Sequence, residues 1–257
     1  MKTKSVLIVF ICIVFAVIVC LSCVSAFSIA QIEITFVAVK DSSSSYFRDV
    51  KEDLDVVLGK SLLFFDRSEV DRIVERYPYL ELTGVEKDYT NKLKVSICER
   101  EEQYAVFSDG AYYMLDQNGF VLDKRAENTY NLDSELKNIA LNLDEIGLMS
   151  PTVGSAITVD DRYTEWLDTV MEIGKAFYLR NTVDSVTINS KEEKIVLFVK
   201  TGISITIERP LDFSEDKLKE AWSAYDTLTD KQKSTGSLSV YRLEDGTIRR
   251  LYSPVTA

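Results

Sequence analysis

The chain has 257 residues, a formal net charge of −11 and no histidine. This length allows one or two domains with hydrophobic cores. The acidic balance argues against nucleic acid and against electrostatic binding to anionic lipid. The lack of histidine removes Ser-His-Asp and Cys-His catalysis and most zinc sites. We therefore expect no catalytic residue, no metal ligand, no cofactor and no small-molecule substrate.

The N-terminal segment predicts a membrane anchor. Residues 5–27 form an apolar run without charge, which reaches the ~20 residues that a bilayer core requires. Lys2 and Lys4 precede it and favour a cytoplasmic tail of residues 1–4, with the rest of the chain outside. A cleaved signal peptide ending at Ala26 is the alternative, and a lipoprotein is a weaker one; the run is longer than an ordinary signal-peptide core.

Beyond the anchor, Cys98 is the only cysteine, so no intrachain disulfide is expected there. Its place after an alternating apolar stretch indicates a partly buried thiol at a strand end. A reactive thiol would need neighbours that lower its pKa.

The first part of the exported chain predicts a small α+β domain. Gly59 and Pro78 are placed to end two amphipathic helices. The expected elements are a strand at 32–39, helices at 47–58 and 70–77, and strands at 82–89 and 93–99.

From Gln103 onwards β-structure dominates. Asp109-Gly110 and Asn118-Gly119 lie between apolar segments and predict hairpins. Asp160 and Asp161 precede a helical stripe and are interpreted as a charged helix start, not as a catalytic carboxylate pair. Further expected elements are helices at 163–177 and 214–228, strands at 183–188, 195–199, 203–207 and 237–243, and a return strand near 247–251.

Four loose motifs, in order and at sensible intervals, resemble the FtsQ/DivIB family of bacterial cell-division proteins. They are Gly59-Lys60-Ser61-Leu62-Leu63-Phe64 before Asp66, residues 72–78 ending in Pro78, residues 85–87 with 92–100, and residues 113–121 around Asp116 and Gly119. Two positions depart from the family pattern, since Thr90 and Glu102 stand where the family has proline.

The resemblance implies an α+β chain with an N-terminal transmembrane helix at 5–27. A small POTRA-like β-α-α-β-β domain would follow at 28–100, and a larger mixed antiparallel β-sheet domain with two helices at 101–243. Residues 244–257 are expected to be a C-terminal tail.

The resemblance also implies a non-enzymatic divisome scaffold in the cell membrane, at the division septum. Its partners would be FtsB/DivIC-like and FtsL-like division proteins, bound by strand addition. Two alternatives stay open: a POTRA-bearing transport or sensor protein, and an anchored cell-wall hydrolase using two carboxylates.

The strand at 237–243 follows the last long helix, so we expect it at a sheet edge, where a partner strand could pair with it. The predicted partner-binding residues are Leu238, Val240, Tyr241 and Leu243.

Overall fold

The computed structural model describes residues 10–15, 18, 27–38, 45–133, 135–177, 179, 182–213 and 215–254; of residues 176–177, 215–218 and 220–221 it describes the backbone alone. Most of the expected anchor at 5–27 therefore lies outside the described residues. Among the residues that are described, no helix has both the length and the apolar character needed to cross a bilayer. The chain divides into a first unit, Met1–Arg100, and a second unit, Glu101–Ala257.

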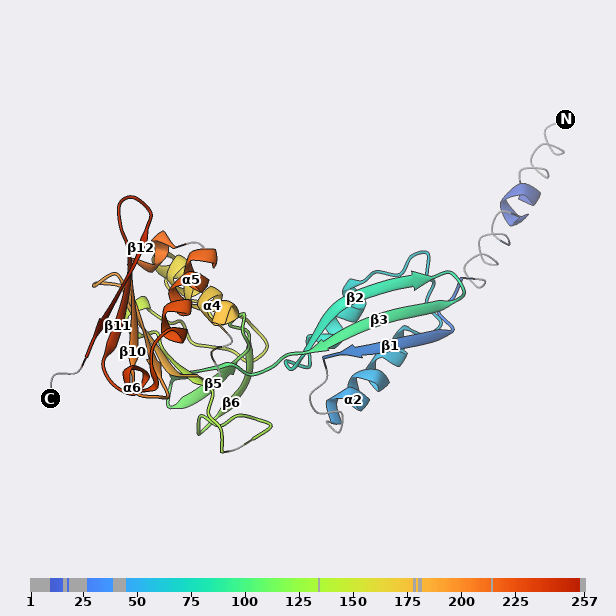
Figure 1. Ribbon diagram of the computed structural model, residues 1–257. Coiled ribbons are helices and arrows are strands. Elements are labelled where there is room, and N and C mark those ends of the chain that lie inside the picture. Colours follow the sequence, from blue (N-terminus) through green and yellow to red (C-terminus); the bar gives the residue numbers. More distant parts are fainter. Residues whose placement is uncertain are drawn as a thin grey trace. The chain divides into compact units, whose positions relative to one another are not determined.

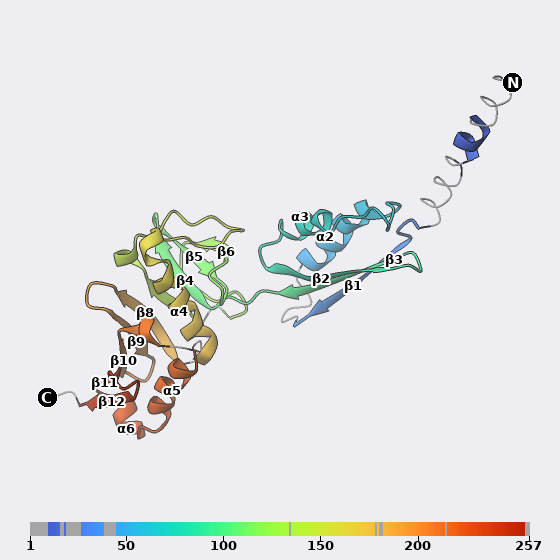
Figure 2. The same cartoon turned by 90° about the horizontal axis from the view of Figure 1, so that it is seen from above.

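The first unit packs two helices on one face of a three-stranded sheet (Figures 1 and 2). The sheet order is β1-β3-β2, with β1 parallel and β2 antiparallel to β3. Along β3 buried and half-buried residues alternate, because one face of the strand meets the helices. The elements are β1 (Gln31–Val37), α2 (Ser45–Leu54), the 3-10 turn η1 (Asp55–Val57), α3 (Ser68–Val74), β2 (Leu80–Asp88) and β3 (Lys92–Glu99).

The second unit contains a nine-stranded sheet, in the order β12-β11-β10-β9-β8-β7-β4-β5-β6. Its strands are β4 (Tyr104–Ser108), β5 (Ala111–Leu115), β6 (Val121–Arg125), β7 (Ile139–Asn142), β8 (Val183–Asn189), β9 (Lys194–Val199), β10 (Ser204–Glu208), β11 (Ser237–Arg242) and β12 (Ile248–Ser253). Its helices are α4 (Thr164–Phe177), α5 (Glu215–Asp226) and the short α6 (Asp230–Lys233), with 3-10 turns η2 (Asp144–Ile146), η3 (Asp161–Tyr163) and η5 (Pro210–Asp212).

The sheet is mixed, as expected: most neighbouring strands are antiparallel, while β4 with β7, β7 with β8, and β10 with β11 are parallel pairs. Between β7 and β8, and between β10 and β11, the chain passes through the helical segments, and such crossovers permit parallel pairing. The expectation that residues 244–257 form a tail needs correction, since Ile248–Ser253 form β12, the return strand predicted near 247–251, and pair with β11.

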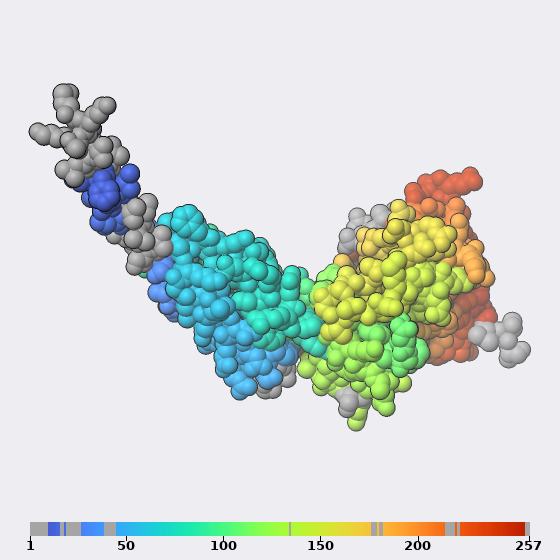
Figure 3. All heavy atoms as spheres, turned by 180° about the vertical axis from the view of Figure 1, so that it is seen from behind, coloured from blue at the N-terminus to red at the C-terminus, as the bar shows by residue number. Residues whose placement is uncertain are grey.

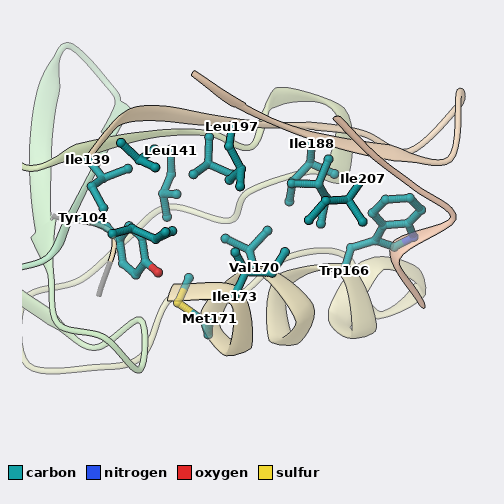
Figure 4. Packing of buried hydrophobic residues seen from close by; sticks show 14 of the residues in the cluster. Tyr104, Ile139, Leu141, Trp166, Val170, Met171, Ile173, Ile188, Leu197 and Ile207 are labelled. Atoms are coloured by element: carbon teal, nitrogen blue, oxygen red, sulfur yellow. The ribbon is translucent and has the colours of Figure 1, made fainter. Parts of the chain in front are cut away.

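The core of the second unit lies between the sheet and helices α4 and α5. Figure 4 shows Val170 and Ile173 of α4 facing Leu141, Leu197 and other strand residues. In Figure 3 residues 150–175, drawn yellow, form an outer face of this unit. The helix begins as the sequence predicts: Asp160 accepts a hydrogen bond from the Arg162 amide at 3.1 Å and caps η3, which leads into α4.

Candidate partner-binding edge

The end of the nine-stranded sheet formed by β12 is open within the described residues. There β12 pairs with β11 alone. The opposite end is partly covered, because the amide of Val121 in β6 donates to the Ser155 carbonyl at 2.8 Å and Gly154 donates to the Val121 carbonyl at 2.9 Å. An uncovered edge strand can accept a strand from another chain.

The hairpin between β11 and β12 is closed by a three-residue turn with Gly246 in the left-handed region, φ +84°. The Leu243 amide donates to the Thr247 carbonyl at 2.9 Å, and the Gly246 amide donates to the Leu243 carbonyl at 2.9 Å. Asp245 stabilises the turn by accepting from the Thr247 amide at 2.8 Å, and this backbone hydrogen bond is the main reason why its pKa is lowered.

This turn fixes which backbone groups of β12 point outward. Leu243 and Thr247 are a hydrogen-bonded pair. From there, non-hydrogen-bonded and hydrogen-bonded pairs alternate along the antiparallel ladder of β11 and β12. Residues 249, 251 and 253 therefore direct their backbone groups at β11. The backbone groups of residues 248, 250 and 252 are directed away from β11, toward the open edge.

The side chains of β12 offer a mixed surface. Arg249 and Arg250 are exposed, although the chain as a whole is acidic. Leu251 is 55% exposed, and Tyr252 packs partly against the core while its hydroxyl donates to the Thr235 carbonyl at 2.9 Å. The edge thus combines basic, apolar and backbone groups.

Of the four residues predicted to bind a partner, Leu238, Val240 and Tyr241 lie one strand further in, on β11, and Leu243 follows that strand at the turn. Leu238 and Val240 are buried in the core of the second unit, and Tyr241 and Leu243 are half-buried. The expectation that residues 237–243 form a sheet edge is wrong, because β11 lies between β10 and β12. The return strand predicted near 247–251 was the available pointer to β12.

The described residues give no support to a second type of site, one with acidic catalysts or metal ligands. No cluster of three or more Cys, Asp or Glu side chains that could hold a metal occurs among them. A pocket of about 230 Å³ beside β4 and β7 has one carboxylate in its lining, that of Asp144.

The buried acids of the described chain have structural partners. Asp116 accepts from the amides of Asn118 at 2.8 Å and Phe120 at 2.9 Å, which holds the turn between β5 and β6. Glu99 accepts a hydrogen bond from the Tyr46 hydroxyl. Glu102 is paired with Arg125 and also accepts from Asn138 Nδ2 at 3.0 Å.

Cys98 is half-buried, and its thiol donates a hydrogen bond to the Glu99 carbonyl oxygen at 3.5 Å. Burial, with a smaller contribution from Glu81, raises the pKa of this thiol. A raised pKa keeps the thiol protonated, so the partly buried strand-end interpretation is supported against a reactive one.

The fold and the edge define a two-unit α+β protein whose larger sheet ends in an open strand. No protein-family model matches the chain. A cell division protein DivIB from Clostridium botulinum strain Hall is 25% identical over 192 residues, which cover 68% of this chain and 70% of the relative. A cell division protein FtsQ from Bartonella bacilliformis is 32% identical over 80 residues, covering 29% of this chain and 26% of the relative.

These relatives confirm that the chain is related to the FtsQ/DivIB cell-division proteins, as its motifs indicate. A solved structure of the major extracytoplasmic domain of DivIB from Geobacillus stearothermophilus aligns at 12% identity with a TM-score of 0.26. That alignment covers 51% of this chain and 98% of the other. A likeness this weak does not bear on the fold. The sequence relationship supports a role in cell division.

Proposed function

We propose that the chain is a non-enzymatic, membrane-anchored scaffold of the division machinery, acting outside the membrane at the septum. Residues 5–27 would form its single span and residues 28–100 its POTRA-like domain. The partners would be other division proteins of the FtsB/DivIC and FtsL kind. The names of the relatives and the uncharged N-terminal run support this assignment.

The open edge of β12 is the observation that carries the partner site. A partner strand added there would satisfy the outward backbone groups of β12 and extend the sheet to a tenth strand. Exposed Arg249 favours a partner segment with acidic side chains. Leu238, Val240, Tyr241 and Leu243 would then act indirectly, as the layer against which β12 is held.

A proline scan of β12 tests this proposal. Arg250→Pro removes a backbone N–H that is directed away from β11, so the β11–β12 ladder can persist while strand addition is blocked. Arg250→Ala is the matched control, because it removes the same side chain and keeps the N–H. Association of the full chain with the DivIC-like protein of the same cell is measured by co-purification.

We expect Arg250→Pro to lose most of the association and Arg250→Ala to keep the larger part of it. Circular dichroism verifies that both variants are folded. Equal association of a folded Arg250→Pro variant and the wild-type chain would refute strand addition at this edge.

A further inference from the structure

One end of the first unit carries four exposed apolar or aromatic side chains, which we call the apolar end: Leu58, Leu63, Phe64 and Tyr89. Their exposed fractions are 41%, 44%, 78% and 63% respectively. Phe64 and Leu63 follow directly on Leu62, which is fully buried. The connector between η1 and α3 therefore uses one apolar residue for the core and turns the next two to the outside.

Backbone hydrogen bonds tie this connector to the start of the unit. The Gly59 amide donates to the Ile29 carbonyl at 2.8 Å, and the Ile29 amide donates to the Lys60 carbonyl at 2.8 Å. The Leu62 amide donates to the Phe27 carbonyl at 2.7 Å. We call residues 59–62, which these bonds join to residues 27–29, the paired segment. Leu58 and Phe64 are within two residues of it, so they lie within about 7 Å of it.

The turn between β2 and β3 lies at the same end, as Figure 1 shows. The Ala30 amide donates to the Asn91 carbonyl at 2.8 Å. The rings of Phe27 and Tyr89 meet edge to face with centroids 6.4 Å apart. Three separate segments thus place apolar side chains around the point where the chain enters the unit.

That entry point is Phe27, the last residue of the expected anchor at 5–27. If this anchor spans the bilayer, as the proposed function holds, residues 27–29 and the paired segment bonded to them lie directly at its end. Phe27 is itself hydrogen-bonded into the unit, so the apolar end must lie at the lipid surface.

We propose that Leu58, Leu63, Phe64 and Tyr89 insert into the interfacial region of the bilayer and hold the first unit against the membrane. This inference rests on the proposed single span. Aromatic rings favour the membrane–water interface, and burial of the aliphatic side chains is favourable there.

Charge does not drive this contact. The chain carries a net charge of −11, and the basic residues beside the connector are paired: Lys60 with Glu69, and Arg67 with Asp71 at 3.7 Å. An apolar contact is expected to persist in high salt, because salt screens charges and leaves apolar burial in place.

Quenching by lipids brominated on their acyl chains tests the inference with the full chain reconstituted in phosphatidylcholine–phosphatidylglycerol vesicles. Phe64→Trp places an indole at the apolar end. Val37→Trp is the matched control, because Val37 is 48% exposed and ends β1, about 20 Å from its first residue. Trp166 and Trp222, both in the second unit, give the wild-type background, which is subtracted.

We expect brominated lipid to quench a large part of the fluorescence that the indole of Phe64→Trp adds, and little of the fluorescence that the indole of the Val37→Trp control adds. The difference should be the same in low and in high salt. Equal quenching of the two indoles in a chain that floats with the vesicles would overturn the inference and leave the proposed anchor intact. A chain that does not float with the vesicles would overturn the anchor and the inference together.

Discussion

Gly236 lies so close to Ser253 that a Cβ atom on the glycine would be 2.5 Å from the Ser253 carbonyl oxygen. Gly236 also has φ +96°, which disfavours any other residue. This glycine precedes β11 and allows the end of β12 to approach. The open edge thus depends on a position that carries no side chain.

Gly236→Ala should therefore destabilise the second unit by about 2 to 4 kcal/mol, from backbone strain and overpacking together. Urea unfolding followed by circular dichroism measures this. Gly246→Ala is the control, because Gly246 also has a positive φ, but its nearest neighbour would be an Arg242 side-chain atom at 3.6 Å. Equal losses in both variants would mean that the contact with Ser253 does not matter.

A second close approach joins α4 to the sheet. A Cβ atom on Gly174 would be 1.4 Å from the hydroxyl oxygen of Tyr104, a fully buried side chain. Gly174→Ala should cost about 1 to 3 kcal/mol, because α4 or the tyrosine must move. Gly84→Ala, where the nearest atom would be Ser96 Cβ at 3.7 Å, is expected to cost less. Thermal unfolding compares the two; a stable Gly174→Ala variant would show that α4 shifts readily.

Glu102 holds the segment that follows β6. It is fully buried, pairs with Arg125, and accepts from the Asn131 amide at 3.1 Å and Asn138 Nδ2 at 3.0 Å. Glu102→Gln should destabilise the second unit by about 3 kcal/mol, because the Arg125 guanidinium loses its buried counter-charge.

A double-mutant cycle separates the pair from the rest of this network. Arg125→Met is combined with Glu102→Gln, and the free energy of unfolding of all four chains is measured. We expect the double variant to lose less than the sum of the single losses. Strict additivity would show that Glu102 acts through its amide partners and not through Arg125.

The start of α4 should respond to acid. The Arg162 side chain, and after it the Arg162 amide, lower the pKa of Asp160 from 3.8 to about 2. Because the folded pKa lies below the unfolded one, the stabilisation is present above about pH 4 and is lost as pH falls toward 2.

Asp160→Asn isolates the charge, since asparagine can still cap the helix. The melting temperatures of wild type and Asp160→Asn should differ most above pH 5 and converge by pH 2. A difference that does not change with pH would contradict the assignment. Asp160→Ala, which also lacks the cap, should stay less stable throughout.

Local chemistry in the sequence determined most of the elements. Alternating or helical apolar spacing predicted β3 and α4, and the turns at Gly110 and Gly119 predicted the β4–β5 and β5–β6 hairpins, because each signal acts within a few residues. The four motifs also indicated the cell-division proteins to which the chain is similar.

Strand order was decided by the tertiary structure. β11 alternates buried and half-buried residues along most of its length, whereas β12 exposes three residues in a row, and neither pattern says which neighbour each strand pairs with. The parallel pairing of β10 with β11 placed Leu238 and Val240 inside the sheet and moved the open edge to β12. The close contacts of Gly236 and Gly174 and the partners of Glu102 likewise join residues far apart in the chain, so only the packed fold could reveal them.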